Sequence, residues 1–176
     1  MRNTLLFLGL TLMLSCQQNK PVSTEKIDAL EAEMRKLDHL DTALAKNLVQ
    51  EYEAYAKMTE HDSMAAVMLY REANVLKEMG EADRENALAV LQKLEKNYPD
   101  HELAPRAAFM RAFVNDESLQ RKQEAAKLYG AFLEKYPEHP LARDAKLLQE
   151  MSLQTEEQQM EYIQKMVEKS RKDSAS

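Results

Sequence analysis

The sequence predicts an all-α protein, and three observations support that prediction. Among 176 residues there are only 3 Gly and 5 Pro, so residues that interrupt helices are scarce. Residues that favour helices, above all Ala, Leu, Glu, Lys, Gln and Met, are abundant. Apolar residues recur at intervals of three and four, whereas no stretch alternates apolar and polar residues for long enough to predict a strand.

The first fifteen residues have the layout of a secretory signal. Arg2 is followed by an uncharged run from Thr4 to Leu14 and then by the small residue Ser15. This run is roughly half the ~20 apolar residues that a membrane-spanning helix needs. A basic start, a short apolar stretch and a small residue at the cleavage point predict a signal peptide over residues 1–15.

Cys16, the only cysteine of the chain, follows this segment directly. An exported thiol that stands alone has no disulfide partner within its own chain. Its placement resembles the signal of bacterial lipoproteins, although Met13 stands where that family prefers Leu. In that family a diacylglyceryl group is attached to the thiol, cleavage precedes the cysteine, and the new amino terminus is usually acylated. The resemblance implies lipidation of Cys16 and no cofactor besides that covalent lipid.

Two other interpretations of the amino terminus stay open: an ordinary signal peptide with an incidental cysteine, and an uncleaved anchor. Residues 16–23 are polar after the cysteine and contain Pro21, which predicts a short lipidated tether. In the sorting rule of the lipoprotein family, Asp after the cysteine retains the protein in the inner membrane. This chain has Gln17 there, so the resemblance implies the periplasmic face of the outer membrane.

Residues 24–61 are predicted to form a long amphipathic N-terminal helix, or two helices with a bend near residues 38–41. The first apolar residues repeat at intervals of three, four and three, at Ile27, Leu30, Met34 and Leu37. The repeat is too short to predict a coiled coil. We expect this face to pack against the rest of the domain. The alternative is oligomerisation through residues 27–37.

The next helices begin and end at polar residues and glycine. His61, Asp62 and Ser63 form a polar break that can cap a new helix, and Gly80 fits a left-handed C-terminal cap. Asp83 and Asp100 are plausible caps for the two helices that follow.

The last part of the chain continues the helical pattern. Residues 115–118 are expected to form a turn between two helices. Thr155 and Gln158 predict a capping box at the start of the final helix. Residues 171–176 are expected to be a flexible tail.

An internal repeat organises residues 62–170. The segment Tyr98–Ala104 (YPDHELA) recurs 38 residues later as Tyr136–Ala142 (YPEHPLA). Small Ala lets neighbouring helices approach, a large apolar residue fills the space one turn later, and Pro ends the second helix of a hairpin. The residues that define the repeat are Ala87, Tyr98, Pro99, Ala125, Tyr136 and Pro137. This pattern predicts helical hairpins that stack into an α-solenoid.

The repeat resembles the tetratricopeptide repeat in its small residue, large apolar residue and terminal proline. Its length of 38 exceeds the usual 34 residues of that family, so small insertions are expected at residues 80–84 and 115–119. Residues 132–145 are similar to repeats of envelope lipoproteins of outer-membrane protein assembly and of the TolA-binding cell-division coordinator. Residues 48–63 are compatible with a degenerate second helix of a preceding repeat, although the terminal proline is missing.

No motif in the chain points to catalysis or to a metal site, so we expect a protein that is not an enzyme. There is no second cysteine, no glycine-rich phosphate loop and no nucleophile elbow. The net charge of −6 opposes binding to nucleic acid. No two histidines have the i, i+4 spacing of a helical metal site; they are His39, His61, His101 and His139. We expect the last two to pack beside the proline turns.

Together these features predict a lipid-anchored periplasmic adaptor that binds a partner peptide or helix on a short helical-repeat groove. The first helix of each hairpin is expected to supply the inner face. Its candidate partner-binding residues, which are polar or basic on otherwise apolar helices, are Arg71, Asn74, Arg106, Arg111 and Asn115. The alternative is a structural envelope protein that oligomerises through the N-terminal helix.

Overall fold

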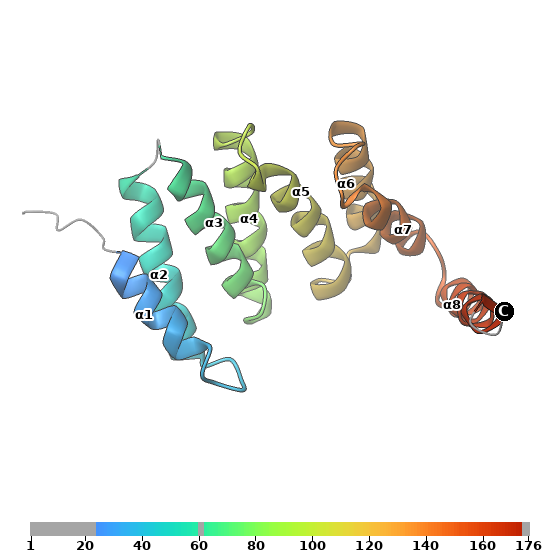
Figure 1. The fold of residues 1–176 in the computed structure, drawn as a ribbon, viewed down its shortest axis with the longest axis horizontal. Helices are drawn as coiled ribbons and strands as arrows, with labels where there is room; N and C mark the ends of the chain where they lie inside the picture. Colours follow the sequence, from blue (N-terminus) through green and yellow to red (C-terminus); the bar gives the residue numbers. More distant parts are fainter. Residues whose placement is uncertain (1–23, 60–61, 174–176) are drawn as a thin grey trace, which may run out of the picture.

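The structure is a computed structural model that describes residues 24–59 and 62–173, which are helical throughout apart from short connections (Figure 1). The described elements are α1 (Thr24–Met34), α2 (Thr42–Met58), α3 (Ser63–Leu76), α4 (Glu81–Asn97), α5 (Leu103–Phe113), the π-helical turn η1 (Val114–Ser118), α6 (Lys122–Lys135), α7 (Ala142–Ser152) and α8 (Glu156–Asp173). The predicted all-α fold is confirmed. Cys16, with the expected signal peptide and tether, lies outside the described residues.

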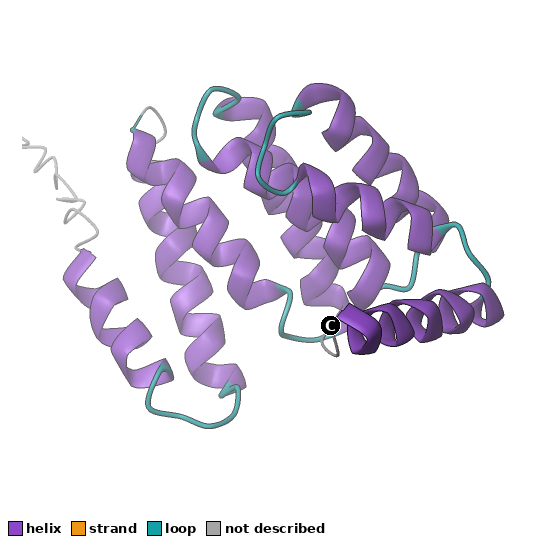
Figure 2. Cartoon of the chain, turned by 45° about the vertical axis from the view of Figure 1, so that its right-hand side comes forward, coloured by secondary structure: helices purple, strands orange, loops and turns teal. Residues whose placement is uncertain are grey.

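The helices pair into hairpins, and the hairpins stand side by side in one row. Figure 1 shows α1 to α7 following one another along this row, with α8 apart at its C-terminal end. The view in Figure 2 shows the same order of packed helices, again with α8 outside the stack. Each helix from α2 to α6 packs on the helices before and after it in the chain. The predicted stack of helical hairpins is therefore present.

The N-terminal segment forms two helices, so the prediction of a single long helix is wrong and its two-helix alternative is correct. The break falls between Met34 and Thr42, and Asp41 caps α2 by accepting a 2.9 Å hydrogen bond from the backbone N–H of Leu44. A capping aspartate favours a helix start over a helix interior, because its carboxylate satisfies a free backbone donor. The broken pattern near residue 41 thus marks a helix boundary.

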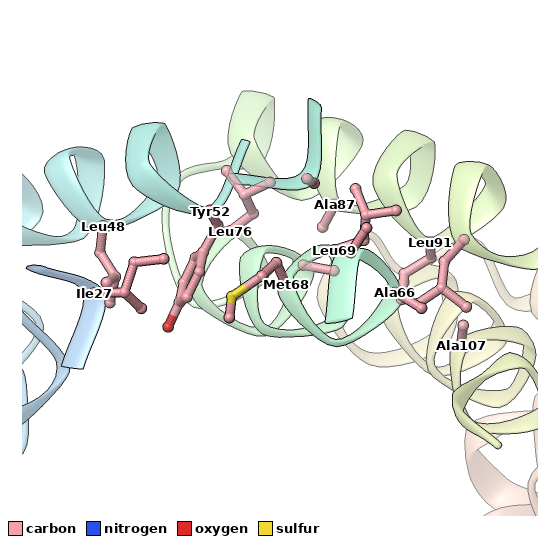
Figure 3. Packing of buried hydrophobic residues seen from close by; sticks show 14 of the residues in the cluster. Ile27, Leu48, Tyr52, Ala66, Met68, Leu69, Leu76, Ala87, Leu91 and Ala107 are labelled. Carbon is pink, nitrogen blue, oxygen red and sulfur yellow. The ribbon is translucent and has the colours of Figure 1, made fainter. Parts of the chain in front are cut away.

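The hydrophobic core runs through the stack between successive helices. Figure 3 shows Tyr52 of α2 and Met68 and Leu69 of α3 interleaved in this layer, and Leu91 of α4 farther along it. Alanines that are 0% exposed sit where helices come closest, as Ala87 does in α4. Their small side chains permit close approach while the larger residues fill the remaining space.

A second core cluster lies between α5, α6 and α7. Tyr129 and Phe132 of α6 are almost completely buried there beside Ala125, which is 0% exposed. Phe109 of α5 packs its ring against both aromatic residues, with centroids 5.7 and 5.8 Å away. The predicted equivalence of Ala87 and Ala125 is thus realised as two buried contact points, one in each cluster.

The same backbone hydrogen bond ends the second helix of three successive hairpins. In each turn the backbone N–H of the residue after the helix donates to the carbonyl four residues earlier, at 3.0, 2.9 and 2.8 Å for Thr59, Tyr98 and Tyr136. The last two have almost identical backbone angles, with φ −132° and ψ near 55°. The predicted 38-residue repeat therefore corresponds to a repeated geometry, and α2 holds the same structural place as α4 and α6.

Three side chains complete these turns in the same way. Asp62 Oδ1, His101 Nδ1 and His139 Nδ1 each accept a hydrogen bond from the backbone N–H two residues later, at 3.0, 3.1 and 3.1 Å. An Nδ1 that accepts leaves the proton of the neutral ring on Nε2, so His101 can donate to Ser63 Oγ at 2.9 Å. The histidines pack in the turns as expected.

Three of the predicted helix caps, at Gly80, Asp83 and Asp100, are wrong. The cap of α5 is supplied by His101 and not by Asp100, because the turn brings the imidazole to the free donor of Leu103. Gly80 has φ −71° and an extended backbone, so it precedes α4 and does not form a left-handed cap. α4 begins at Glu81, which places Asp83 within its first turn. There its charge favours the helix start through the dipole.

The expected turn at residues 115–118 is a π-helical turn that continues α5. The backbone N–H of Leu119 donates to the carbonyl of Val114, five residues earlier, at 3.0 Å. The wider turn takes up extra residues without ending the helix, which is how the insertion expected here is accommodated. Gln120 follows with φ 54°, a left-handed conformation that reverses the chain into α6.

A buried carboxylate fastens this π-helical turn to the last two packed helices. Asp116 is 2% exposed, and its Oδ1 lies 2.8 Å from Lys122 Nζ of α6. Its Oδ2 accepts a 3.0 Å hydrogen bond from Ser152 Oγ at the end of α7. Because a buried carboxylate needs such partners, the three side chains fix α7 against the end of α5.

The final helix begins as predicted and then leaves the stack. Thr155 and Gln158 form the reciprocal capping box: the Thr155 N–H donates to Gln158 Oε1 at 3.0 Å, and the Gln158 N–H donates to Thr155 Oγ1 at 3.3 Å. α8 extends away from α7 and does not pack against it as α6 packs against α5 (Figure 1). Among the described residues no helix is long and apolar enough to cross a membrane.

A second buried carboxyl group lies in the core, on α3. Glu72 of α3 is 5% exposed, and its Oε2 has no hydrogen-bond partner among the described residues. Burial, reinforced by Glu53 of α2, raises the pKa of Glu72 from 4.5 to about 7, against the opposing effect of Lys93 and Lys57. The unfolded chain ionises this carboxyl at lower pH than the folded chain does, so folding stability falls as pH rises from about 4.5 to about 7.

Replacement of Glu72 by Gln should therefore stabilise the protein in a pH-dependent way. We expect the free energy of unfolding at pH 8 to rise by about 1–3 kcal/mol, with a smaller gain at pH 4.5, because only the charged form is penalised. Urea denaturation at both pH values measures the difference. The exposed Glu134→Gln is the matched control, and an equal gain at both pH values contradicts the prediction.

Candidate partner-binding groove

A hollow on the described surface lies between the first helices of two consecutive hairpins. It has a volume of about 580 Å³ and runs between α3 and α5 to the start of α7. We call it the α3–α5 groove. Its lining comprises Tyr70, Asn74, Lys77, Arg106, Phe109, Met110, Phe113, His139, Pro140 and Leu141.

The floor of the α3–α5 groove is aromatic and rigidly supported. Phe109 packs from α5 onto the rings of Tyr129 and Phe132, which are themselves buried in the second core cluster. Phe113 lies one helical turn later on the same face and is 37% exposed. An apolar side chain that enters this groove therefore meets fixed aromatic surface, which favours specific packing.

One end of the groove is formed by the His139 turn. The imidazole is held by the Leu141 N–H and by the edge-on contact of its ring with Phe132, at 5.7 Å between centroids. Pro140 and Leu141 follow and line this end. The repeated turn that spaces the hairpins thus also closes the groove.

The rim of the groove is polar and mostly basic. Asn74 donates its side-chain amide to the carbonyl of Tyr70 at 2.8 Å, which leaves its amide oxygen for another donor. Lys77 pairs with Glu78 beside the groove. The exposed Arg106 has no hydrogen-bond or ion-pair partner within the described parts of the chain. In a chain of net charge −6, this rim offers a cation to an acidic ligand group.

The structure brings two of the five predicted partner-binding residues into the groove, Asn74 and Arg106. Arg71 does not line the groove and instead stabilises the fold, because its Nη1 donates a 3.0 Å hydrogen bond to Glu31 Oε1 of α1. The same oxygen accepts a 2.7 Å hydrogen bond from the Tyr52 hydroxyl of α2. Burial and this bond to Glu31 raise the pKa of Tyr52, so the tyrosine stays a donor. Glu31 thereby links three helices.

The other two predicted residues are also engaged within the fold. Arg111 Nε lies 3.0 Å from Glu95 Oε1 of α4, a carboxyl whose pKa is raised by burial against the opposing charge of Arg111. Asn115 is 4% exposed and donates its side-chain amide to the carbonyl of Arg111 at 2.8 Å. Because Asn115 is buried and Arg111 is paired, neither residue lines the groove, and the placement of Asn115 does not support partner binding.

Sequence reasoning missed the apolar floor of the groove. Phe109, Phe113 and Tyr70 were not distinguished from core residues, because a stripe of large apolar side chains usually marks a buried face. The available signal was the width of the apolar surface of α5, whose eleven residues LAPRAAFMRAF include only two charges. A helix that is apolar on more than one side offers a second face besides the one in the core.

The described residues hold no candidate metal site. They contain no group of three His, Cys, Asp or Glu side chains close enough to hold a metal ion. What the groove offers is shape, aromatic surface and one free cation. These properties suit recognition of another protein segment.

Comparison with known proteins identifies the repeats. Residues 67–101 and residues 106–139 match the model of the tetratricopeptide repeat. The first match contains α4 and the His101 turn, and the second contains α6 and ends at His139. The chain as a whole matches no curated protein. The helices that form the groove thus belong to tetratricopeptide repeats.

The two arginines on α3 and α5 should differ in their effect on stability. Arg71→Ala removes the ion pair with Glu31 and should lower the free energy of unfolding by about 0.5–1.5 kcal/mol. Arg106→Ala breaks no hydrogen bond or ion pair within the described structure and should change the free energy of unfolding by less than about 0.5 kcal/mol. Chemical denaturation of both variants measures this difference. Equal destabilisation by the two substitutions contradicts the assignment of Arg106 to the free rim.

Proposed function

We propose that this protein is an interaction scaffold whose α3–α5 groove holds an apolar segment of a partner protein. The observation that carries the proposal is the groove itself, with its aromatic floor formed on two consecutive repeats. Tetratricopeptide repeats support this role, because stacked helical hairpins create concave surfaces suited to extended segments or helices.

The chemistry of the groove limits the partner. Phe109, Met110 and Phe113 favour one or more large apolar side chains, since burial of such groups drives most protein association. Arg106 favours an acidic side chain next to them, where it steers the encounter and fixes the register. The partner segment is therefore an apolar one with a carboxylate on one edge.

The scaffold is anchored in the cell envelope in our proposal. Cys16 carries a lipid and holds the helical repeats at the periplasmic face of the outer membrane. What supports this is the layout of residues 1–16, a basic start and a short apolar run that ends at a lone cysteine. More than one acyl chain makes such an anchor stable.

The apolar residues Ile27, Leu30, Met34 and Leu37 form what we call the N-terminal seam. The burial of this seam favours the scaffold over assembly through residues 27–37. Ile27 is fully buried in the first core cluster, and Leu30 and Met34 are partly buried against it. Of the four seam residues only Leu37 is markedly exposed, at 38%. Side chains already used to hold α1 on the stack are not available to join separate chains.

Photocrosslinking in cells tests the proposed groove. The full chain carries p-benzoylphenylalanine at Phe113 in the groove or, as the matched control, at the exposed Glu134 on α6. We expect a discrete crosslinked protein from position 113 that is absent from position 134 and is lost when Arg106→Glu is added. Equal capture at both positions, or capture from position 134 alone, contradicts a binding role for the groove.

Lipidation is tested by metabolic labelling with an alkyne fatty acid. We expect the chain to be labelled and to fractionate with membranes, and Cys16→Ser to abolish the label because the acceptor thiol is gone. Ser15→Gly, which keeps a small residue before Cys16, serves as the control. Label that persists in the Cys16→Ser variant excludes this thiol as the anchor.

A further inference from the structure

The position of α8 outside the stack has a cause in the sequence of α7. Where α5 packs on α6 through Ala108, 8% exposed, and Ala112, 0% exposed, the residues 38 positions later on α7 are Lys146 and Glu150. Both of these charged residues are exposed. A long charged side chain in the place of alanine prevents close helix approach and is costly to bury. α7 therefore ends the stack with a polar face, and α8 is left without a hairpin partner.

α8 carries an apolar stripe and, beside it, an acidic edge. Its apolar stripe consists of Met160, Ile163 and Val167, which are 57%, 46% and 47% exposed. These residues are spaced by three and four and so lie along one face of the helix. Glu157, Glu161 and Glu168, spaced by four and seven, form an acidic edge beside that stripe, and of these Glu161 pairs with Lys165 of the same helix at 2.6 Å.

We propose that the α3–α5 groove of one copy of this chain binds α8 of a second copy. This inference rests on the proposed function and names the partner of the same groove. The complementarity is both apolar and electrostatic: the apolar stripe of α8 faces the aromatic floor, and its acidic edge meets the free Arg106 on the rim. An amphipathic helix laid into an apolar groove is a common mode of recognition between proteins.

The connection between α7 and α8 favours a second copy over the same chain. Only Leu153–Thr155 join the two helices. Ser152, at the end of α7, is held by its hydrogen bond to Asp116, and the Thr155 capping box fixes the start of α8. The groove lies at the opposite end of α7, beside Leu141, and α8 runs beneath the stack without packing into it (Figure 2). A second copy reaches the groove without unmaking these contacts.

Disulfide trapping between two tagged copies of the full chain tests the proposal. One copy carries Phe113→Cys in the groove and the other carries Ile163→Cys on α8. We expect a mixed disulfide dimer when both are expressed together and mildly oxidised. Asn74→Cys replaces Phe113→Cys as a second groove position, so the result does not depend on one substitution. The chain with native Cys16 alone gives the background, and Glu134→Cys is the matched control outside the groove.

Charge exchange adds a specific readout. Arg106→Glu in the groove copy should lower the yield of the mixed dimer roughly tenfold, because like charges then meet at the rim. Glu157→Lys together with Glu168→Lys in the other copy should restore it. Lys96→Glu, at an exposed position on α4, should leave the yield unchanged.

A further variant carries Phe113→Cys and Ile163→Cys in the same chain. Three outcomes overturn the proposal: the only dimer formed is between two Ile163→Cys copies, the doubly substituted variant forms its disulfide within one chain, or no disulfide forms above background. If the photocrosslinker at Phe113 captures a different protein while no mixed dimer forms, the groove keeps its proposed function and the second copy is excluded. If position 113 captures nothing and no mixed dimer forms, both proposals fail.

Discussion

The hydrogen-bonded turn after α2, α4 and α6 is the constraint on which the rest of the structure depends. Each turn is closed by a side chain that accepts from the backbone N–H two residues later, supplied by Asp62, His101 and His139. Because the same bonds recur, each new hairpin starts in the same relation to the one before it. The turns thereby set α3 beside α5 and close the groove with the start of α7. The position of the α3–α5 groove therefore follows from the hydrogen bonds that cap these turns.

Polar groups, partly buried at the N-terminal end and buried at the C-terminal end, secure the two ends of the stack, where repetition alone does not. At the N-terminal end Glu31 accepts hydrogen bonds from Tyr52 and Arg71 and joins α1 to α2 and α3. At the C-terminal end Asp116 joins the π-helical turn to α6 and α7 through Lys122 and Ser152. Such groups are costly to bury unless they are paired. Their hydrogen bonds also require a particular geometry, so they fix the relative positions of the helices more closely than apolar contacts do.

The hairpins and their turns could be predicted because they depend on short-range chemistry that repeats. Tyr98–Ala104 and Tyr136–Ala142 have similar sequences and adopt the same turn, and the Thr155 capping box is readable from two residues. Other features depend on contacts between distant residues. From the sequence, Arg71 cannot be distinguished from a cation that faces solvent. Its structural role depends on its hydrogen bond to Glu31, 40 residues away in the chain. The α3–α5 groove could not be predicted from the sequence either, because a floor residue such as Phe109 lies on the same helix as core residues.

We propose that the surfaces left outside the packed core are the binding surfaces of this protein. Methyl-resolved NMR of the full chain labelled at methionine tests it directly, because Met110 lines the groove and Met68 is 2% exposed in the core. A synthetic peptide of residues 154–173 is added in steps. The account predicts that the Met110 signal shifts saturably while the Met68 signal stays in place. An unmoved Met110 signal, or a Met68 signal that shifts as much, contradicts it.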